Sequence, residues 1–432
     1  MRKSIAVIGG QLGDEGKGKI VDYVVQQAAQ KVHTTDAYHR PILVRRYQGG
    51  ANAGHTLTVN GQRHALHLVP SGILEPQAYN LIDQQVFVNP RFLVEEIQRL
   101  QTVGVAVSPD NLGIAANAQV TLDYHVADDQ VDYTKKQRSS TGNGIRQTAV
   151  DKQNRVGIRF VEFLDQKAFR NALKERFPNG FPEQYDSLES FIDSYAAERD
   201  FLQGFVTQSH VANKRHGRDY EIWEGAQGVL IDVDVGLYPD VTSSNPAFIP
   251  GKTDLRLGVF KLYKSSAGTG KRPFVSQMPQ KLQRTVRKPW GEFGTTTHKP
   301  RDIGWFDAVA AKYAVEAAQI DVAVFTCGDK MELLSQLGVK PKIVVSYDVG
   351  GIGFREWNHS FHKRGFLHHV TPVFEEFEPW RNFTEQDGRS LTPQAACYVR
   401  RIEELLEREC ILIGTGPGRE EMIVRKNPYD LI

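Results

Sequence analysis

Short apolar runs alternate with longer amphipathic segments along most of the chain. The runs are rich in β-branched residues and bounded by glycine or a carboxylate, which is typical of buried parallel strands. They cover 4–10, 42–47, 156–160, 221–225, 321–328, 342–347 and 410–416. Apolar residues recur at helical spacing over 92–104, 188–205, 307–319 and 395–409. The alternation predicts an α/β protein with a large, mostly parallel central sheet flanked by helices, whose ligands bind at the carboxyl ends of the strands.

The first of these units is the clearest. Residues 4–10, "SIAVIGG", predict a strand that ends in glycines, and the apolar residues of 20–28 predict a helix. A glycine loop lies between them. The polar segments 30–41 and 355–372 lack either period and are interpreted as surface excursions. The chain shows no internal repeat or obvious linker, so a single domain over 1–432 is expected.

Composition excludes several classes of protein. The 432 residues carry 53 Lys plus Arg against 51 Asp plus Glu, so no overall field favours nucleic acid or an anionic membrane. The three cysteines have no C-x-x-C spacing, which argues against a disulfide framework or a structural zinc site. With no signal peptide or long apolar span, a cytoplasmic protein is expected.

The loop "GGQLGDEGKGKI" at 9–20 contains most of a phosphate-binding P-loop. It has G-x-x-x-x-G-K, but Ile20 stands where that motif has a hydroxyl for Mg²⁺. Backbone N–H groups and a helix N-terminus would bind phosphate, and Lys17 or Lys19 would add a charge. Asp14 could replace the hydroxyl as metal ligand, act as a general base, or do both.

A second glycine-rich turn at 45–61 carries Asn52 and His55. A histidine between Gly54 and Thr56 in a loop could act as an acid or stabilise a transition state. A structural histidine is an equally open reading.

Other polar stretches follow apolar runs. Residues 139–155 offer Thr141, Lys152 and Arg155 for a phosphate, although a polar loop would have the same composition. The remaining candidates are Gln227 and Thr242 in 223–246, Lys299 and Arg301 in the threonine-rich 294–305, Asp329 at the end of 321–328, and the glycine turn 414–420. The histidines at 359, 362, 368 and 369 match no metal-site spacing, which favours a solvated loop.

Taken in order, these segments resemble the adenylosuccinate synthetase family. They read "GDEGKGKIVD", "RYQGGANAGHTL", "HLVPSGIL", "LDYHVA", "EGAQGVLIDVDVGLYPDVTSSN", "EFGTTT", "GWFDAVA", "RSLTPQAA" and "TGPGREEMI". The set spans nearly the whole chain and is far more specific than one glycine loop. It implies a homodimeric, P-loop-NTPase-like single domain with subsidiary subdomains, which joins IMP to L-aspartate with GTP and Mg²⁺.

The resemblance implies a reaction in two steps. The γ-phosphate of GTP activates the 6-oxygen of IMP, and the amine of aspartate then displaces phosphate. Asp14 would remove the ring proton and bind Mg²⁺ with the Gly54 carbonyl. His55 would assist as a general acid, Lys17 would neutralise charge, and Gln227 would orient the base.

The resemblance also implies the binding residues. For GTP they are Gly13, Asp14, Glu15, Gly16, Lys17, Gly18, Gly54, His55, Thr56, Arg301, Asp329, Gly414, Thr415 and Gly416. For IMP they are Asp14, Lys17, Asn52, Ala53, Gly54, His55, Thr141, Arg155, Gln227, Thr242 and Lys299, with Arg155 reaching across the dimer. For the amino acid they are Thr295, Thr296, Thr297, Lys299 and Arg301.

The departures from the family pattern cluster around the donors. The guanine motif T-K-x-D is here 326–329, with Cys327 replacing the lysine, and the aspartate loop T-T-G-R-x-R is 296–301, with a His-Lys-Pro sequence. Asn143 replaces an arginine, and 266–275 departs from R-V-G-x-G-P-F-P-T-E. A lysine cannot bind a carboxylate with the two-pronged geometry of an arginine.

Several hypotheses therefore stand beside the family reaction. One is a divergent paralogue that uses another amine donor, ATP, or both. Another is a catalytically weak nucleotide-binding regulator, although such a protein would not need the base Asp14 and the acid His55. An isolated P-loop kinase is disfavoured by Ile20, and a phage-type branch acting on a 2-aminopurine nucleotide by Asp14, which that branch lacks.

Overall fold

The computed structural model describes residues 2–32, 40–59, 61–136, 141–267, 274–294 and 299–432. The chain divides into two compact units. The first takes in Met1–Ser4, Val21–His55 and His64–Gly225, and the second takes in Ile5–Ile20, Thr56–Arg63 and Ala226–Ile432. Strands and helices alternate in both units, as expected for an α/β protein.

The first unit contains a parallel sheet in the order β10-β8-β6-β2-β11. Its strands are β2 (Ile42–Arg46), β6 (Ala78–Ile82), β8 (Leu112–Ala115), β10 (Val206–Thr207) and β11 (Tyr220–Glu224). A smaller parallel sheet joins β3 (Gly49–Gly50), β7 (Val86–Val88) and β9 (Gln119–Val120). Parallel strands are buried on both faces, and the residues of β2, β6 and β8 are all buried.

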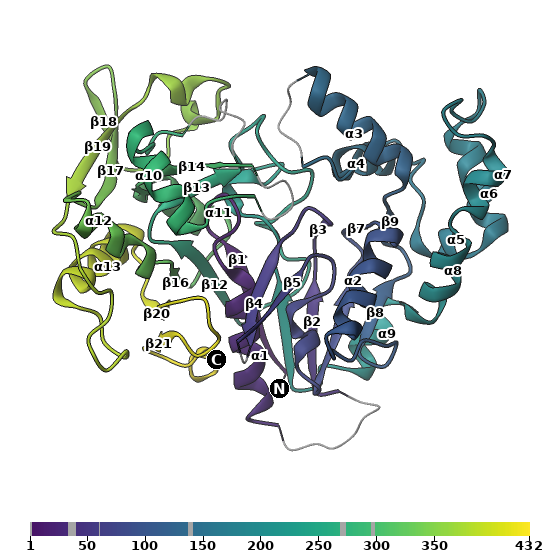
Figure 1. The fold of residues 1–432 in the computed structure, drawn as a ribbon, viewed down its shortest axis with the longest axis horizontal. Coiled ribbons are helices and arrows are strands. Elements are labelled where there is room, and N and C mark those ends of the chain that lie inside the picture. The colour runs from purple at the N-terminus through teal and green to yellow at the C-terminus, as the bar shows by residue number, and fades with distance from the viewer. Residues whose placement is uncertain (1, 33–39, 60, 137–140, 268–273, 295–298) are drawn as a thin grey trace. The chain divides into compact units, whose positions relative to one another are not determined.

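The helices of this unit follow the strands. They are α2 (Pro90–Thr102), α3 (Asp123–Lys136), α4 (Ile145–Gln153), α5 (Phe160–Leu164), α6 (Gln166–Arg176), α7 (Leu188–Asp193), α8 (Ala196–Leu202) and α9 (Ser209–Arg215). Figure 1 shows α5 to α8 gathered into a helical group beyond β9. Aromatic contacts between Phe163, Phe169 and Tyr195 hold this group together.

The second unit contains the order β1-β12-β16-β20-β21, parallel except for the last pair. Its strands are β1 (Lys3–Gly9), β12 (Leu255–Lys261), β16 (Val322–Thr326), β20 (Cys410–Gly414) and β21 (Met422–Val424). The helices are α1 (Lys17–Ala29), α10 (Gln280–Trp290), α11 (Ala308–Ala317), α12 (Glu332–Gln336) and α13 (Pro393–Leu406). The start of β1 and the later turns of α1 are grouped with the first unit.

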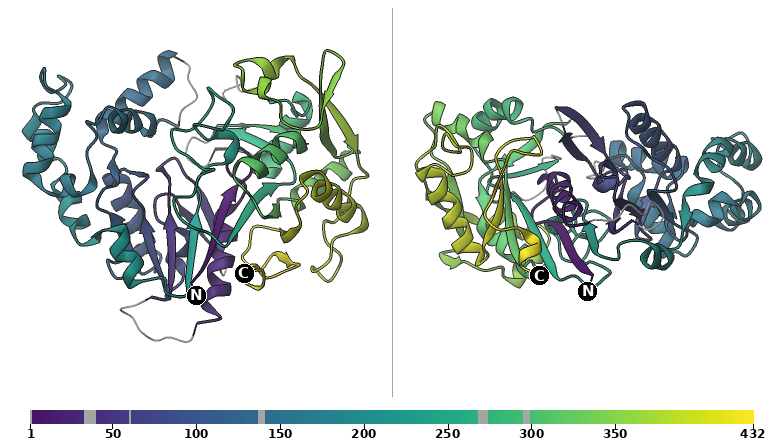
Figure 2. Two further views of the ribbon diagram at one scale, coloured as in Figure 1. Left: turned by 180° about the vertical axis from the view of Figure 1, so that it is seen from behind. Right: turned by 90° about the horizontal axis from the view of Figure 1, so that it is seen from below.

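Smaller ladders complete the second unit. An antiparallel pair joins β13 (Lys264–Ala267) and β14 (Arg301–Gly304), and a mixed sheet joins β15 (Phe306–Asp307), β17 (Lys342–Val349), β18 (Ile352–Phe354) and β19 (Thr371–Glu376). In both views of Figure 2 the yellow-green β17–β19 sheet lies at the edge of the unit, away from the purple β1. Strands β4 (His55–Val59) and β5 (Gln62–Leu66) form a two-stranded sheet.

Short 3₁₀ turns fill several connections. They are η1 (Ser71–Leu74), η2 (Gln203–Phe205), η3 (Val229–Ile231), η4 (Asp329–Met331), η5 (His359–His362), η6 (Phe366–His369) and η7 (Pro428–Asp430). Among the described helices none combines the length and the apolar character that crossing a membrane requires.

Most of the predicted elements are present, and the differences have physical causes. The run 156–160 is not a strand: an extended segment pairs at one bridge between Gln119 and Arg159, and Phe160 begins α5. The helix predicted over 188–205 is two helices, because Tyr195 leaves helical geometry with φ −106° and ψ 10°. The predicted strand 342–347 belongs to the small mixed sheet.

The segment 355–372 is more ordered than a surface excursion. It contains η5 and η6, and Phe361 and Leu367 are buried. Phe361 packs on Tyr347 and Trp357, and Trp357 donates a hydrogen bond to His362. In the described part of the chain, no group of three or more His, Cys, Asp or Glu side chains is arranged to bind a metal ion. Most of the other segment, at 33–39, lies outside the described residues.

Candidate active site

The loop between β1 and α1 turns two adjacent carboxylates in different directions. Gly13, Asp14 and Gly16 have φ of 94°, 62° and 85°, left-handed values that glycine adopts without strain and that Asp tolerates. The Glu15 carboxylate is fully buried and accepts hydrogen bonds from the Gln11 N–H (3.2 Å) and the Gly13 N–H (2.7 Å). Asp14 keeps a third of its side chain exposed. Glu15 therefore supports the loop from inside, whereas Asp14 can meet a ligand.

Both loop lysines have protein partners. Lys17 lies 2.7 Å from the Glu15 carboxylate, and both side chains are buried. Lys19 donates to the carbonyls of Gly416 (2.8 Å) and Glu421 (2.6 Å), which ties α1 to the glycine turn at 414–416. Burial lowers the pKa of Lys19 to about 8.

Neighbouring strands fix the position of this loop. The Gln11 side chain donates to the carbonyls of Lys261 and Tyr263 and accepts from the Lys261 N–H. Thr326 at the end of β16 donates to the Glu15 carbonyl (2.8 Å). The Gln227 backbone lies against β1 so closely that a Cβ at Gly9 would come within 2.4 Å of its carbonyl oxygen. The predicted residue Gln227 is thus brought next to the predicted loop.

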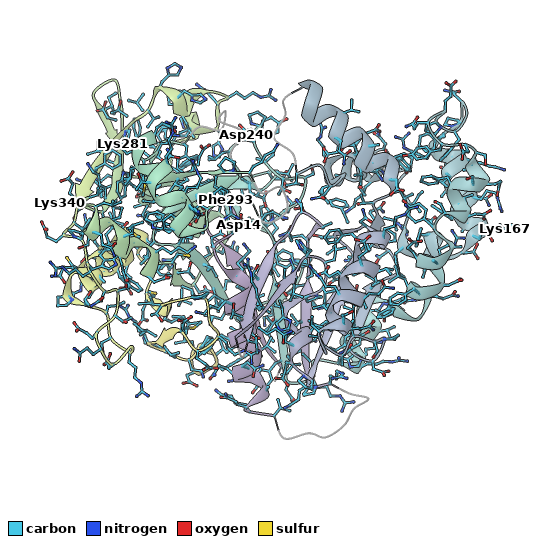
Figure 3. All side chains as sticks on the ribbon, in the orientation of Figure 1. Asp14, Lys167, Asp240, Lys281, Phe293 and Lys340 are labelled. Atoms are coloured by element: carbon cyan, nitrogen blue, oxygen red, sulfur yellow. The ribbon has the colours of Figure 1, made fainter. Side chains whose placement is uncertain are left out.

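Asp14 begins a chain of alternating charges within the second unit. Its Oδ2 lies 2.7 Å from Nη2 of Arg301, and Nη1 of Arg301 donates to Oε2 of Glu292 (2.9 Å). Glu292 also accepts from Lys261 (2.8 Å) and from the Tyr263 hydroxyl (2.5 Å). Burial opposes ionisation of Glu292, but the Lys261 and Arg301 cations outweigh it and lower its pKa. Figure 3 labels Asp14, and Phe293, which follows Glu292.

His55, at the start of β4, sits in a second buried network that lies within the first unit. Its Nδ1 is 2.5 Å from Oε1 of Glu224, which also accepts from Arg46 (2.9 Å) and the Ser71 hydroxyl (2.6 Å). The other oxygen accepts from the Ser71 N–H (2.7 Å). Burial opposes ionisation of Glu224, but Arg46 and the His55 hydrogen bond prevail, and its pKa falls to about 2.

This geometry selects a tautomer for His55. An ionised carboxylate only accepts hydrogen bonds, so Nδ1 of His55 carries the proton that points at Glu224. The Arg46 Nη2 also lies 3.2 Å from Nδ1, but two donors cannot share a hydrogen bond, so that approach is a close contact only. Nε2 is therefore the ring nitrogen that can exchange a proton with a ligand.

A third buried carboxylate supports the turn that carries Asn52 and His55. Glu96 on α2 accepts from the backbone N–H groups of His67, Leu68 and Val69. The His67 ring in turn lies 2.6 Å from the Ala53 carbonyl. Burial raises the pKa of Glu96 to about 6 despite its three donors.

The remaining predicted residues lie on exposed or partly exposed loops. Thr141 is exposed and accepts from Asn143 (3.1 Å), and exposed Arg155 follows α4 with φ 63°. The Thr242 N–H donates to the Ile231 carbonyl (2.7 Å), and the Lys299 carbonyl accepts from the Gly294 N–H (2.8 Å). Thr295, Thr296 and Thr297 lie outside the described residues.

Asp329 follows β16 and begins η4. Burial raises the pKa of its carboxyl group. A Cβ at Gly328 would lie 2.1 Å from the Phe383 ring, and the Trp380 indole donates to the Gly328 carbonyl (3.2 Å). These aromatic rings occupy the space that a side chain at 328 would need.

The sequence patterns did not identify the buried carboxylates Glu224 and Glu292 as parts of the site. Each lies in a segment noted for other reasons, "EIWEG" and "EFGTTT". A charged residue among apolar ones was the available signal, because a buried carboxylate needs a partner. Its partner, however, can be remote: Arg46 lies 178 positions before Glu224.

The chain is similar to known proteins over nearly its whole length. The family model described as adenylosuccinate synthetase matches residues 6–423. The chain is 36% identical to the adenylosuccinate synthetase of Heliobacterium modesticaldum, covering 97% of this chain and 98% of that protein, and 36% identical to that of Lacticaseibacillus casei, covering 99% of each.

Two solved structures resemble the chain. The fully ligated adenylosuccinate synthetase of Plasmodium falciparum has a TM-score of 0.83 and 27% identity, covering 98% of this chain and 99% of that one. The succinoaminodeoxyadenylate synthetase of cyanophage S-2L has a TM-score of 0.58 and 17% identity, covering 100% and 98%, and shows a shared fold only.

Proposed function

The chain belongs to the adenylosuccinate synthetase family of ligases that form C–N bonds, and we propose that it joins IMP to L-aspartate with GTP as phosphoryl donor. The observation that carries this proposal is the difference between the surroundings of the two carboxylates in the loop 13–16. The Glu15 carboxylate accepts hydrogen bonds from N–H groups of the loop itself, whereas Asp14 stays partly exposed beside a helix N-terminus. A binding loop would not need an outward carboxylate at that place.

Each catalytic role is assigned to a group whose surroundings suit it. Asp14 takes the ring proton of IMP, so that the 6-oxygen can attack the γ-phosphate. His55 gives a proton from Nε2 to the transferring group, because Glu224 fixes Nδ1. Lys17 and the loop amides neutralise the developing charge, and Gln227 orients the base.

The donor set fits Mg²⁺, which the family uses in general. Oδ2 of Asp14 pairs with Arg301, and the carboxylate keeps a third of its surface exposed for a hard cation. We assign Asp14 and the Gly54 carbonyl as its protein ligands, and the ion would lower the barrier by neutralising charge on the transferred phosphoryl group.

Substrate contacts are assigned to the predicted residues. Asp329 would accept hydrogen bonds from guanine, and Gly414, Thr415 and Gly416 would also bind GTP. Lys19 supports this assignment, because it donates to the Gly416 carbonyl and its pKa responds to the Asp329 charge. Thr141, Arg155 and Thr242 would bind the 5′-phosphate of IMP. Arg155 lies exposed after α4, and we propose that it acts across a homodimer. We place the enzyme in the cytoplasm.

A second candidate is the same phosphoryl chemistry with another amine donor or with ATP. Lys299 and Cys327 favour it, since the two family residues they replace are the arginine of the aspartate loop and the lysine of the guanine motif. Proton removal by Asp14 would be shared by both candidates.

The test is a donor matrix. The protein is incubated with IMP, Mg²⁺ and either GTP or ATP, together with aspartate or one of a panel of other amines, and phosphate release and nucleotide mass are followed. GTP-dependent adenylosuccinate formation is expected. Phosphate release with product only from another amine would replace aspartate, and no release in any pairing would contradict the enzyme proposal.

A further inference from the structure

We propose that Glu292 is a positioning residue for this reaction, acting through Arg301 on Asp14. The role rests on the proposed function, in which Asp14 takes a proton from the substrate. Arg301 is 6% exposed and divides its guanidinium between two carboxylates, with Nη1 on Glu292 and Nη2 on Asp14. One of these carboxylates is buried and the other is assigned to chemistry.

The buried end of this chain is held rigidly. Lys261 and the Tyr263 hydroxyl both bond to Oε1 of Glu292, which leaves Oε2 for Arg301. The Arg301 N–H also donates to the Glu292 carbonyl (3.0 Å), so the two residues are joined through backbone and side chain. Glu292 therefore sets where the guanidinium can lie at the start of β14.

The division of the guanidinium limits how strongly Arg301 holds Asp14. A guanidinium can bind one carboxylate with both prongs, which is its strongest arrangement. With Nη1 kept on Glu292, only Nη2 is left for Asp14. The Nε of Arg301 is buried and has no hydrogen-bond partner among the residues that the structure describes. Loss of the Glu292 contact with Nη1 would let Arg301 turn fully onto Asp14 and hold it away from substrate.

The same unit contains a matched control. Asp307 is buried, and it accepts from Lys264 (3.1 Å) and from the Tyr347 hydroxyl (2.8 and 2.9 Å). Like Glu292, it is a carboxylate held by a lysine and a tyrosine, but among the residues that the structure describes no arginine links it to Asp14. In the variant Asp307→Asn the side-chain oxygen can still accept the capping hydrogen bond from the Ala310 N–H, since Asn and Asp are similar N-caps.

The experiment compares Glu292→Gln with Asp307→Asn. We measure kcat, the KM for IMP, IMP binding by calorimetry without nucleotide donor, and Tm. Both variants should lose thermal stability, because each leaves a buried lysine without its carboxylate. Only Glu292→Gln should lower kcat, by about 30- to 100-fold, with IMP binding within about threefold of the wild-type value.

Equal kcat values in the two variants would overturn the positioning role, and so would a loss of IMP binding that accounts for the whole effect. Should Glu292→Gln fail to fold, Glu292→Asp keeps the charge but withdraws the carboxylate by one methylene, and the same kcat loss against a folded protein is expected. A wild-type protein without product overturns the proposed function and this role together, whereas an active wild type with an unaffected Glu292→Gln overturns this role alone.

Discussion

Each of the two units buries a glutamate in a network that reaches a side chain assigned to the reaction or to substrate binding, and the two glutamates bind different kinds of side chain. Glu224 in the first unit binds His55, whereas Glu292 in the second binds Arg301. Both carboxyl side chains have no exposed surface. Cations lower the pKa of both, which keeps them charged at neutral pH.

The difference lies in what the partner can do. Histidine exchanges its proton near neutral pH, and arginine keeps its own. Glu224 therefore fixes which nitrogen of His55 can transfer a proton, while Glu292 fixes the direction of a permanent charge. The hydroxyl donors differ as well: Ser71 uses both its N–H and its Oγ on Glu224, whereas Tyr263 uses its phenol on Glu292. The first network thus fixes the position of a proton on His55, and the second fixes the position of the positive charge on Arg301.

The largest effect should come from the residues at the ends of the two networks. Asp14→Asn keeps the shape but cannot accept the ring proton, so kcat should fall at least about 10³-fold, with IMP binding mostly spared. His55→Asn should lower kcat by about 10²- to 10⁴-fold, the usual range for one acid or base. Single-turnover assays with mass detection of the phosphorylated IMP would measure both.

Retained turnover in Asp14→Asn would show that the base is another group. Loss of IMP binding equal to the loss of kcat in either variant would show that the residue binds substrate without transferring a proton. The surface variant Lys340→Ala serves as the control, since Lys340 and its partner Glu378 are both exposed and kcat should be unchanged.

The second prediction concerns the stability of the fold in acid, and it distinguishes a buried carboxylate that stabilises the fold when charged from one that does so when protonated. The Glu224 pKa falls from 4.5 to about 2 on folding, which corresponds to roughly 3 kcal/mol of stability. Because the folded pKa is the lower one, this stability is present above pH 4.5 and is lost as pH falls through 2. Urea unfolding at pH 7 should show Glu224→Gln about 3–5 kcal/mol less stable than wild type, with the gap about 2 kcal/mol narrower at pH 3.

Glu96 supplies a control of the opposite sign. Its pKa rises on folding from 4.5 to about 6, so its contribution is fullest below pH 4.5 and is lost as pH rises through 6. The gap between wild type and Glu96→Gln should therefore widen on acidification from pH 7 to pH 4. Parallel behaviour of the two variants would contradict the assigned charge states.

The pattern of apolar and polar residues predicted the parts of the molecule that depend on local sequence. β1, the glycine loop and α1 follow from one apolar run, one cluster of glycines and one helical period. It did not predict β12, although that strand lies between β1 and β16, because Arg256 and Gly258 interrupt its apolar run. The run at 156–160 failed in the opposite way, since buried Ile158 and Phe160 occur without a ladder.

The side chains of the site likewise differ in whether local sequence indicates their role. Asp14 stood out because a carboxylate in a phosphate-binding loop is unusual. Glu15 next to it looked equivalent, and the structure distinguishes it by its burial, its backbone donors and its pair with Lys17. The roles of Glu224 and Glu292 depend on side chains that are far away in the sequence, and a single sequence does not indicate such pairs.

The smallest effect should come from the hydroxyl groups of the two networks, and it gives the finest comparison. Ser71→Ala and Tyr263→Phe each remove one O–H that donates to a buried carboxylate and leave every cation in place. A hydrogen bond to a charged group contributes about 1.5–3 kcal/mol, so both variants should be destabilised by that amount.

Their effects on activity should differ. Oε1 of Glu224 receives Ser71 together with His55, so loss of the Ser71 hydroxyl should shift His55 and lower kcat about threefold to tenfold. Oε1 of Glu292 receives Tyr263 and Lys261, while Arg301 uses Oε2, so Tyr263→Phe should leave kcat within about twofold. Urea unfolding and steady-state kinetics measure the two quantities. A larger kcat loss in Tyr263→Phe than in Ser71→Ala would mean that kcat depends more strongly on the Glu292 network. That result would contradict the distinction between a network that positions a proton on His55 and one that positions the charge of Arg301.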